Sequence, residues 1–409
     1  MIRRKILPVL ILAMIVLAAC SVQAGTVKPS LAVVTIPASP SAATPVPSST
    51  ATPIPTAIET PVPPALPVVD SPALARIDFQ DKNNGWGLAV NANGYVLRTV
   101  NGGSTWLNAT PPGVGSIGLS ATLTVLNTNT VWVLVPGTDF FSGTLYRTGN
   151  GGITWSSNPV PFGGALIQFQ DGSRGRALAD RGAGAGSEPI DLFQTSDGGV
   201  SWTSVFHDNP GQHGSSDSLP LAGFKNGMIF IDAQTGWVTG SLPAEGDVYL
   251  YVTHDSGVSW SQQNLPLPTG YETYLYMPQA PVFFGKDGFL PLTIYLPSST
   301  LLTFYTSHDG GLTWSGDPAE VKKGIKPGLS AFADALHAWC WDGGTSLYSS
   351  SDGAQTWTAI NTNLNLSGNL SRLEFVPGFI GWALTRLDDS GHSQLYRTTD
   401  GVNWTPLIR

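Results

Sequence analysis

Asp197-Gly198-Gly199-Val200-Ser201-Trp202 is one of seven copies of a short phrase in this chain. The tryptophans that close successive copies are 49, 47, 58, 54, 43 and 47 residues apart. A repeat at such a period predicts an array of similar structural units. The first polar residue and the closing tryptophan of the seven copies are Asn101 and Trp106, Asn150 and Trp155, Asp197 and Trp202, Asp255 and Trp260, Asp309 and Trp314, Asp352 and Trp357, and Asp400 and Trp404.

Each copy follows a short apolar run, such as Leu192-Phe193 or Phe304-Tyr305. An apolar run before Asp-Gly or Asn-Gly is a strong hairpin signal. The Asp or Asn side chain can accept hydrogen bonds inside its own turn, and Gly supplies the positive φ. We therefore expect each phrase to be a structural turn that its tryptophan covers.

A second motif lies 18 to 26 residues before each closing tryptophan, as in Phe79…Gly85-Trp86 and Phe230…Gly236-Trp237. The two motifs together predict four strands per unit, and in the first unit these are roughly 74–79, 86–91, 95–99 and 104–110. Four antiparallel strands every 40–50 residues are typical of a propeller blade. The fold class predicted for 71–409 is therefore all-β, a seven-bladed β-propeller with four-stranded antiparallel blades.

The last unit is complete, with strands expected at roughly 371–376, 381–386, 394–398 and 403–408. No strand is missing from either end of the array. We therefore expect blades 1 and 7 to meet through side-chain packing, with Leu66-Pro67-Val68-Val69 adding at most an outer strand.

Over residues 72–409 the chain resembles the Asp-box (BNR) repeat propellers, and among them the photosystem II stability/assembly factor-like family. Repeats of that family pair a Phe-x-Asp…Gly-Trp turn with a Thr-x-Asp-Gly-Gly-x-Thr-Trp box. The resemblance implies a propeller that serves in assembly and carries an arginine-rich face. Asp-box propellers also include sialidases, xyloglucan-cleaving enzymes and the sortilin ectodomain. Asn101, Asn150 and Gly175-Arg176 depart from the repeat pattern, and only ten arginines fall in the propeller.

Residues 1–20 have the features of a bacterial lipoprotein signal peptide. Arg3-Arg4-Lys5 is a positive start, Ile6 to Val16 is a short apolar core, and Leu17-Ala18-Ala19-Cys20 matches the lipoprotein box. The alternatives are an ordinary signal peptide and a membrane anchor that happens to end in Cys. We expect lipid on Cys20, a membrane attachment through that lipid, and an extracytoplasmic location on the cell surface or periplasmic side.

Residues 21–70 predict a disordered linker, because they hold 11 Pro and only Lys28, Glu59 and Asp70 as charges. Besides Cys20 the only cysteine is Cys340, which lies between two tryptophans. With Cys20 lipidated, no disulfide can form within the chain. We expect Cys340 to be a small buried residue.

Charge argues against one class of partner. From Cys20 onward the chain has 17 Lys and Arg against 28 Asp and Glu. Nucleic-acid binding needs a basic surface, so we expect none. No spacing predicts a metal site, and no strand, Gly-rich loop and helix follow one another as a phosphate site requires. We expect no metal and no cofactor, and a monomer.

Catalysis is the alternative to binding. A sialidase-like site would need an Arg triad, a Tyr–Glu nucleophile pair and an Asp acid, and its usual Arg-Ile-Pro signature does not occur. A general glycosidase needs two carboxylates facing one cleft. No carboxylate spacing identifies such a pair, so no catalytic residue is predicted and a non-enzyme is favoured.

Because strand direction alternates within a blade, the box turns share one face with the turns between first and second strands. The other face receives the long insertions 180–190, 205–224, 240–247, 262–280 and 315–328. Long loops on a rigid scaffold are where function is usually placed. The predicted ligand residues on this face are His207, Asp208, His213, Glu245, Asp247, Tyr271, Tyr274 and Tyr276.

The aromatic run Tyr271 to Met277 has two interpretations: an exposed contact surface, or the ordinary start of an inner strand. The sequence thus predicts a lipid-anchored binding or scaffold propeller, assembly-factor-like, for a protein or a surface polysaccharide. A glycoside-acting enzyme with its site on the face opposite the boxes stays open.

Overall fold

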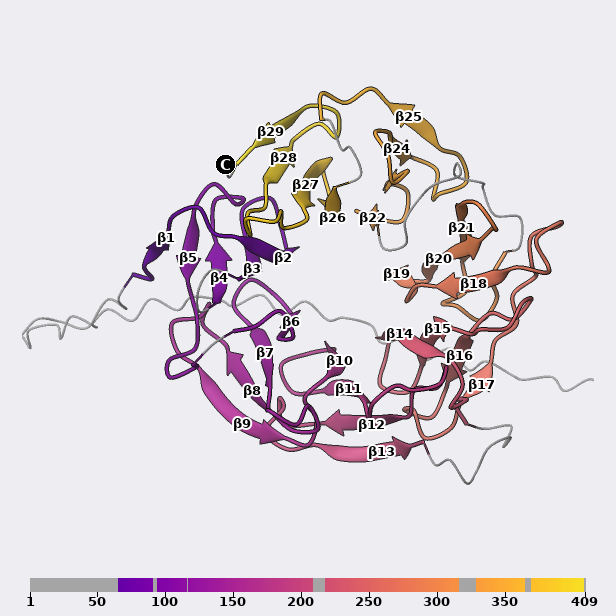
Figure 1. Ribbon diagram of the computed structural model, residues 1–409, viewed down its shortest axis with the longest axis horizontal. Coiled ribbons are helices and arrows are strands. Elements are labelled where there is room, and N and C mark those ends of the chain that lie inside the picture. The colour runs from indigo at the N-terminus through magenta and orange to yellow at the C-terminus, as the bar shows by residue number, and fades with distance from the viewer. Residues whose placement is uncertain are drawn as a thin grey trace, which may run out of the picture. The chain divides into compact units, whose positions relative to one another are not determined.

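The computed structural model describes residues 65–90, 94–115, 117–208, 218–315, 329–364 and 369–407. These residues form seven antiparallel sheets that follow one another around a ring (Figure 1). They contain no helix, and therefore none that could cross a membrane. The seven-bladed propeller predicted from the repeats is confirmed.

Blades 1 to 4 are formed by consecutive strands in chain order. They are β1 (Val68–Val69), β2 (Leu74–Phe79), β3 (Gly85–Ala89), β4 (Tyr95–Thr99) and β5 (Trp106–Asn108); β6 (Thr122–Val125), β7 (Val131–Pro136), β8 (Gly143–Thr148) and β9 (Ser156–Val160); β10 (Ala165–Phe169), β11 (Gly175–Asp180), β12 (Ile190–Thr195) and β13 (Thr203–His207); β14 (Phe224–Phe230), β15 (Gly236–Ser241), β16 (Leu250–Thr253) and β17 (Ser261–Gln262).

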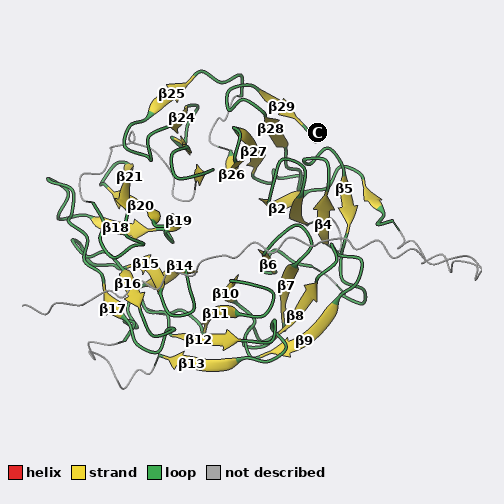
Figure 2. Ribbon diagram, turned by 180° about the vertical axis from the view of Figure 1, so that it is seen from behind, coloured by secondary structure: helices red, strands yellow, loops and turns green. Residues whose placement is uncertain are grey.

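Blades 5 to 7 complete the ring. Their strands are β18 (Leu275–Pro278), β19 (Val282–Phe284), β20 (Asp287–Tyr295) and β21 (Thr300–Ser307); β22 (Ser330–Phe332), β23 (Ala338–Trp341), β24 (Leu347–Ser350) and β25 (Thr358–Ile360); β26 (Leu370–Val376), β27 (Ile380–Thr385), β28 (Leu395–Thr398) and β29 (Trp404–Pro406). In every blade the first strand along the chain is innermost, except in blade 1, where β2 is innermost and β1 is added at the rim outside β5 (Figure 2).

The box turns, by which we mean the seven phrases that begin at the residues quoted above, close through their own side chains. In blade 5, Asp309 Oδ1 accepts the Thr313 N–H at 3.0 Å and Oδ2 accepts the Thr313 hydroxyl at 2.6 Å. Asn101 reproduces both bonds, because its Oδ1 accepts the Thr105 N–H and its Nδ2 donates to Thr105 Oγ1. An Asn therefore substitutes for Asp without loss of the turn.

A buried hydroxyl lies two residues before each box turn, at the first position of the Thr-x-Asp-Gly-Gly-x-Thr-Trp pattern. Ser307 Oγ donates to Asp309 Oδ1 and accepts the Gly311 N–H, both at 2.8 Å. The equivalent residues of the other blades are also buried: Thr99, Thr148, Thr195, Thr253, Ser350 and Thr398. Each gives a buried turn N–H a partner, as interior backbone groups require.

Backbone bonds show which turns share a face. The Gly102 N–H in the first box donates to Asn83 O in the β2–β3 turn at 2.7 Å, and Gly198 donates to Ser173 O in blade 3. The box face therefore also holds the turns between first and second strands, as predicted. The other face, which we call the loop face, holds the remaining connections.

In the described residues, stacked rings join four pairs of neighbouring blades: 2 and 3, 5 and 6, 6 and 7, and 7 and 1. Trp132 of blade 2 stacks on Phe169 of blade 3 with centroids 3.6 Å apart, and its Nε1 donates to Gly198 O at 2.8 Å. The seam between the chain ends repeats this arrangement. Trp382 stacks on Phe79 at 3.7 Å and donates to Gly102 O at 2.9 Å.

No strand of one end completes a blade of the other among the described residues, since β2 to β5 and β26 to β29 are separate sheets. Val68 and Val69 pair with Leu107 and Trp106 as an added outer strand. The predicted mode of closure, by side-chain packing with one extra outer strand, is confirmed.

Blade 5 departs from the expected four simple strands. Its inner strand is split into β18 and β19, both paired with β20. Pro278 and Pro281 flank the interruption, and proline cannot donate to a strand ladder. At the outer position the described residues show only an isolated bridge between Thr306 and Ser315.

Candidate functional site

A hollow of about 350 Å³ opens on the loop face between blades 2 and 3. Three connections build it: the β7–β8 turn with Phe141, the β9–β10 link with Pro161 and Phe162, and the end of β11 with Asp180 and Arg181. Asp191, near the start of β12, completes the wall. We call this site the Arg181 hollow.

Three polar side chains interlock at its edge. Asp191 Oδ1 lies 2.5 Å from His207 Nδ1, and Arg181 Nη1 lies 3.1 Å from His207 Nε2. Arg181 Nε also lies 3.5 Å from Asp191 Oδ2. The same Arg181 Nη1 lies 3.3 Å from His207 Nδ1, so it is almost equally far from both ring nitrogens and does not lie on the lone pair of Nε2. Because a carboxylate only accepts, Nδ1 of His207 donates to Asp191.

This geometry limits the chemistry that His207 can perform. A general base needs a ring nitrogen that can reach the proton it abstracts. Here Asp191 occupies Nδ1, and Nε2 is the ring nitrogen that remains to accept a proton. Arg181 is held at the hollow by Asp191 and by the ring of His207.

Two exposed aromatic residues lie in the β7–β8 turn, and one of them, Phe141, lines the hollow. Phe140 and Phe141 are 57% and 60% exposed. Asp139 Oδ1 accepts the N–H groups of Phe141 and Ser142 at 3.2 and 3.1 Å, and Gly163 N–H donates to Phe140 O at 3.0 Å. Phe140 has a φ of +58°. A bulky residue held in this strained region presents its neighbours rigidly to solvent.

A second hollow, of about 250 Å³, lies on the other side of Asp180, between blades 3 and 4. Its base is Lys225, whose Nζ donates to the carbonyls of Glu188, Leu221 and Gly223 at 2.7, 3.2 and 3.4 Å. Burial lowers the pKa of Lys225 to about 8 and raises that of Glu188. With all three ammonium protons engaged, Lys225 is an anchor for the surrounding loops.

The structure separates the predicted ligand residues. His207 lies at the Arg181 hollow, whereas Asp208 is buried at 3% exposure, where its charge acts on Lys225. Glu245 and Asp247 are exposed on the blade 4 loop, whose Gly246 N–H donates to Tyr274 O. His213 lies outside the described residues.

The tyrosines belong mainly to the core of blade 5. Tyr276 is 1% exposed in β18, and its hydroxyl donates to Tyr271 O. Tyr271 and Tyr274 are half-buried against the same core cluster. The interpretation of this run as an ordinary strand start is right, and Tyr276 is wrong as a ligand residue because no solvent reaches its ring.

Sequence reasoning missed Phe140, Phe141, Arg181 and Asp191. Asp139-Phe140-Phe141-Ser142 does carry a signal, because two aromatic residues occupy a short turn between strands. Arg181 lies at the start of the predicted 180–190 insertion. The pairing of Arg181 with His207 is a contact between β11 and β13 ends, and it needs the register of the sheet.

A third hollow, of about 370 Å³, lies among the inner strands of blades 1, 5, 6 and 7. Glu374 Oε2 accepts the Phe79 N–H at 3.0 Å, and its Oε1 accepts from Arg372 Nε at 2.8 Å. Gln168 makes the same kind of bond to the Phe230 N–H in blade 4. Burial and the neighbouring Asp78 raise the pKa of Glu374 to about 7, against the influence of Arg372. These groups tie one inner strand to the next.

Metal-ligating side chains do not gather in groups of three or more anywhere in the described ranges. Cys340 is buried and unbonded to another cysteine, as expected, and burial raises the pKa of its thiol. Cys20 lies outside the described residues.

Comparisons with known proteins support the fold and do not identify a function. No protein-family model matches the chain, and no curated protein matches it in sequence. The chain is similar in structure to YCF48 bound to D1 peptide, at 16% identity and a TM-score of 0.51, over 84% of this chain and 99% of that one. YCF48 from Cyanidioschyzon merolae gives 20% identity and a TM-score of 0.51, over 79% and 94% of the two chains.

An enzyme shares the architecture to a similar degree. A polysaccharide lyase, the PL25 ulvan lyase, is 11% identical with a TM-score of 0.50, over 84% of this chain and 96% of that one. The chain therefore has a propeller fold in common with YCF48 and with a polysaccharide lyase.

Proposed function

We propose that this chain is a binding propeller whose Arg181 hollow receives a segment of another protein. The observation that carries the proposal is the exposed Phe141, which lines the hollow beside the cluster of Arg181, Asp191 and His207. Exposed aromatic side chains on a rigid turn are favoured contact residues in protein interfaces. The solved YCF48 that resembles this chain is bound to a D1 peptide, which supports a peptide-like ligand.

The charges in the hollow suggest the kind of segment. Asp180 and Asp191 bring two negative charges against the single positive charge of Arg181. A partner with a basic side chain between apolar residues complements this surface, because opposite potentials favour docking. The net charge of −8 for the whole chain acts in the same direction at longer range.

A glycoside-acting enzyme is the second candidate. It is favoured by one observation: Asp180 and Asp191 line one hollow that also holds an aromatic ring. Two carboxylates facing one cleft are what glycoside hydrolysis requires. Release of reducing ends from an acidic or neutral polysaccharide, lost in Asp180→Asn, would establish this alternative and displace the first.

We also propose that a lipid on Cys20 attaches the propeller to the membrane. Leu17-Ala18-Ala19-Cys20 supports lipid attachment at Cys20, and the Pro-rich stretch 21–70 supports a spacer that carries the propeller away from the membrane. We predict that Cys20→Ser abolishes incorporation of labelled fatty acid and leaves the precursor unprocessed or releases the protein. Undiminished labelling of that variant would rule out the lipoprotein assignment.

A photo-crosslinking amino acid at position 141 tests the binding site in the native membrane. We expect it to capture a defined protein partner through a segment with a basic residue. The same amino acid at Leu312, which is 65% exposed on the box face, is the matched control. An identical capture pattern from both positions would contradict a specific site at the Arg181 hollow.

A further inference from the structure

The space between blade 3 and blade 4 on the box face, which we call a wedge, lacks the aromatic ring that the other six blades place at this position of their second strand: Trp86, Trp132, Trp237, Phe289, Trp339 and Trp382. In blades 1, 2 and 7 a tryptophan near the start of the second strand pairs across the sheet with an arginine of the third strand. The guanidinium lies over the indole, 5.9 Å from the Trp86 centroid in blade 1 and 5.4 Å from that of Trp132 in blade 2. Together the two side chains occupy the space next to the following blade.

Blade 3 replaces both members of this pair. Arg176 stands where the tryptophan is expected, and its cross-strand partner is Gln194. An arginine and a glutamine have no bulky ring to fill the wedge. The result is a hollow of about 270 Å³, which we call the Arg176 pocket.

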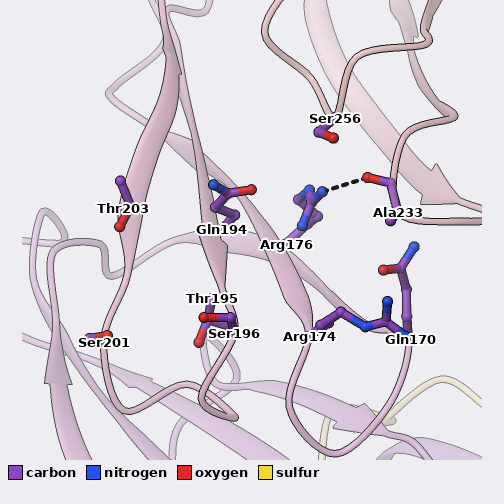
Figure 3. Close-up of a pocket in the computed structure, with 10 residues that line it drawn as sticks. All are labelled: Gln170, Arg174, Arg176, Gln194, Thr195, Ser196, Ser201, Thr203, Ala233 and Ser256. Atoms are coloured by element: carbon purple, nitrogen blue, oxygen red, sulfur yellow. Dashed lines mark hydrogen bonds between the residues drawn. The ribbon is translucent and has the colours of Figure 1, made fainter.

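The lining of the Arg176 pocket is polar and contains no carboxylate. Figure 3 shows its ten residues, of which nine have polar side chains: Gln170, Arg174, Arg176, Gln194, Thr195, Ser196, Ser201, Thr203, Ala233 and Ser256. They come from the β10–β11 turn, from β11 to β13 with the intervening box turn, and from two turns of blade 4.

Arg176 is a buried cation, and several of its N–H donors make no hydrogen bond. It is 6% exposed, and its guanidinium lies 5.0 Å from the Phe230 ring centroid. Nη2 donates to Ala233 O at 2.9 Å and Nη1 to Gly175 O at 3.4 Å, and Nε is buried without a partner, as are the Nε atoms of Arg98, Arg147 and Arg397. A guanidinium has five N–H donors, and the two bonds of Arg176 use only two of them. The other N–H groups can donate to a ligand. A buried polar group in this state costs stability unless something satisfies it.

Nearby carboxylates belong to their own turns. Asp171 Oδ2 holds Arg174 at 2.7 Å, and its Oδ1 accepts two N–H groups of its turn. Asp197 accepts from Ser201 and Thr195, and Asp232 accepts from Gln234 and Thr235. They weaken the positive potential at the pocket, yet none of them lines it or pairs with Arg176.

We propose that the Arg176 pocket binds a small oxyanion, a carboxylate or sulfate group, against Arg176 and Gln194. Arginine recognises such groups through parallel N–H donors, and buried charge-assisted bonds are stronger than neutral ones. The amide and hydroxyl groups around it can hydrogen-bond the remaining oxygens. The Arg176 pocket lies on the face opposite the Arg181 hollow. Its anion binding can therefore be tested separately from the proposed binding of a protein segment.

Isothermal titration calorimetry of the purified full chain tests this site. Sodium sulfate and sodium glucuronate are titrated at constant ionic strength set by sodium chloride, because exposed charges respond to salt. We expect saturable binding of at least one of them. Tighter binding of sulfate indicates a free tetrahedral anion, and tighter binding of glucuronate indicates an acid group carried on a sugar.

Arg176→Trp is the decisive variant, since it restores the residue that fills the wedge in other blades. It should raise the thermal midpoint in sulfate-free buffer and weaken anion binding by at least about tenfold. Arg176→Gln should weaken binding to the same extent. Arg98→Gln removes the same charge from a filled wedge in blade 1 and should leave binding unchanged.

Three results would each overturn the proposal: no saturable binding by the wild-type chain, unchanged binding in Arg176→Trp, or an equal loss in Arg98→Gln. The first would mean that Arg176 serves only to close the wedge.

Discussion

At the scale of single residues, the turns rather than the core carry the ionisable groups that matter most for acid stability. The hydroxyl and N–H of Thr313, together with Ser307, lower the pKa of Asp309 to about 2. Hydrogen bonds of the same kind lower the pKa of Asp197 and Asp400. Asn101 and Asn150 keep the same turn without a titrating group.

Asp309→Asn should therefore make the protein less sensitive to acid. A carboxyl whose pKa is lowered by folding contributes stability above its unfolded pKa, and that contribution is lost as the pH falls through the folded value. For Asp309 the loss falls between about pH 4 and about pH 2. Thermal midpoints measured across this range should fall less steeply in the variant than in the wild type.

Asn101→Asp is the reverse change and should make the fall steeper. Equal slopes for all three proteins would show that the carboxylate bonds of the box turns contribute nothing to the pH dependence.

At the scale of elements, the strand positions followed from the sequence to within one or two residues. Observed β2, β4 and β26 coincide closely with the expected 74–79, 95–99 and 371–376. The turn chemistry is local, so hairpins can be read from it. The divided inner strand of blade 5 escaped prediction because the aromatic run before it matches both a loop and a strand.

The candidate sites were less predictable than the strands. Arg176 was recognisable as a departure from Gly-Trp, but the hollow that results depends on Gln194 across the sheet. Arg181, Asp191 and His207 come from three strands, and no spacing along the chain reveals that they meet. Sites formed between elements need the register, whereas sites inside one turn do not.

Burial of the box tryptophans differs between blades and predicts graded effects. Trp260 is 1% exposed, packs at 6.1 Å from Phe230 and donates to Gly257 O at 3.0 Å, whereas Trp202 is half-buried. Trp260→Ala should cost about 3–5 kcal/mol of unfolding free energy. Trp202→Ala should cost less, because more of its surface already faces water.

Urea denaturation of both variants measures this difference. Neither change should alter partner affinity in protein that still folds. A box tryptophan that affects binding but not stability would contradict its role as a turn cover.

At the scale of the whole molecule, the ring closes without exchange of strands between the chain ends. The seam has the contacts of an ordinary blade pair: a ring stack, an indole bond to a box carbonyl, and Arg397 Nη2 donating to Lys82 O at 3.0 Å. Every other neighbouring pair of blades is also joined directly by the chain. Blades 1 and 7 have no such connection, so only non-covalent contacts hold them together and the seam should open most easily.

Native-state hydrogen exchange should show residues 75–110 and 371–409 opening before the middle blades. Local opening proceeds from the region of lowest stability. Earlier exchange in blades 3 to 5 would show that the ring packing, rather than the chain connection, determines the order.

The central claim is that the loop face binds a protein segment at the Arg181 hollow, and the affinity of Phe141→Ala for the crosslinked partner tests it most directly. Titration calorimetry with the wild type, Phe141→Ala and Leu312→Ala compares two exposed apolar residues on opposite faces. We predict that Phe141→Ala binds roughly 30-fold more weakly, a loss of about 2 kcal/mol that is usual for an aromatic contact at the centre of an interface. Leu312→Ala should bind as the wild type does. Equal affinities of Phe141→Ala and the wild type would contradict the account.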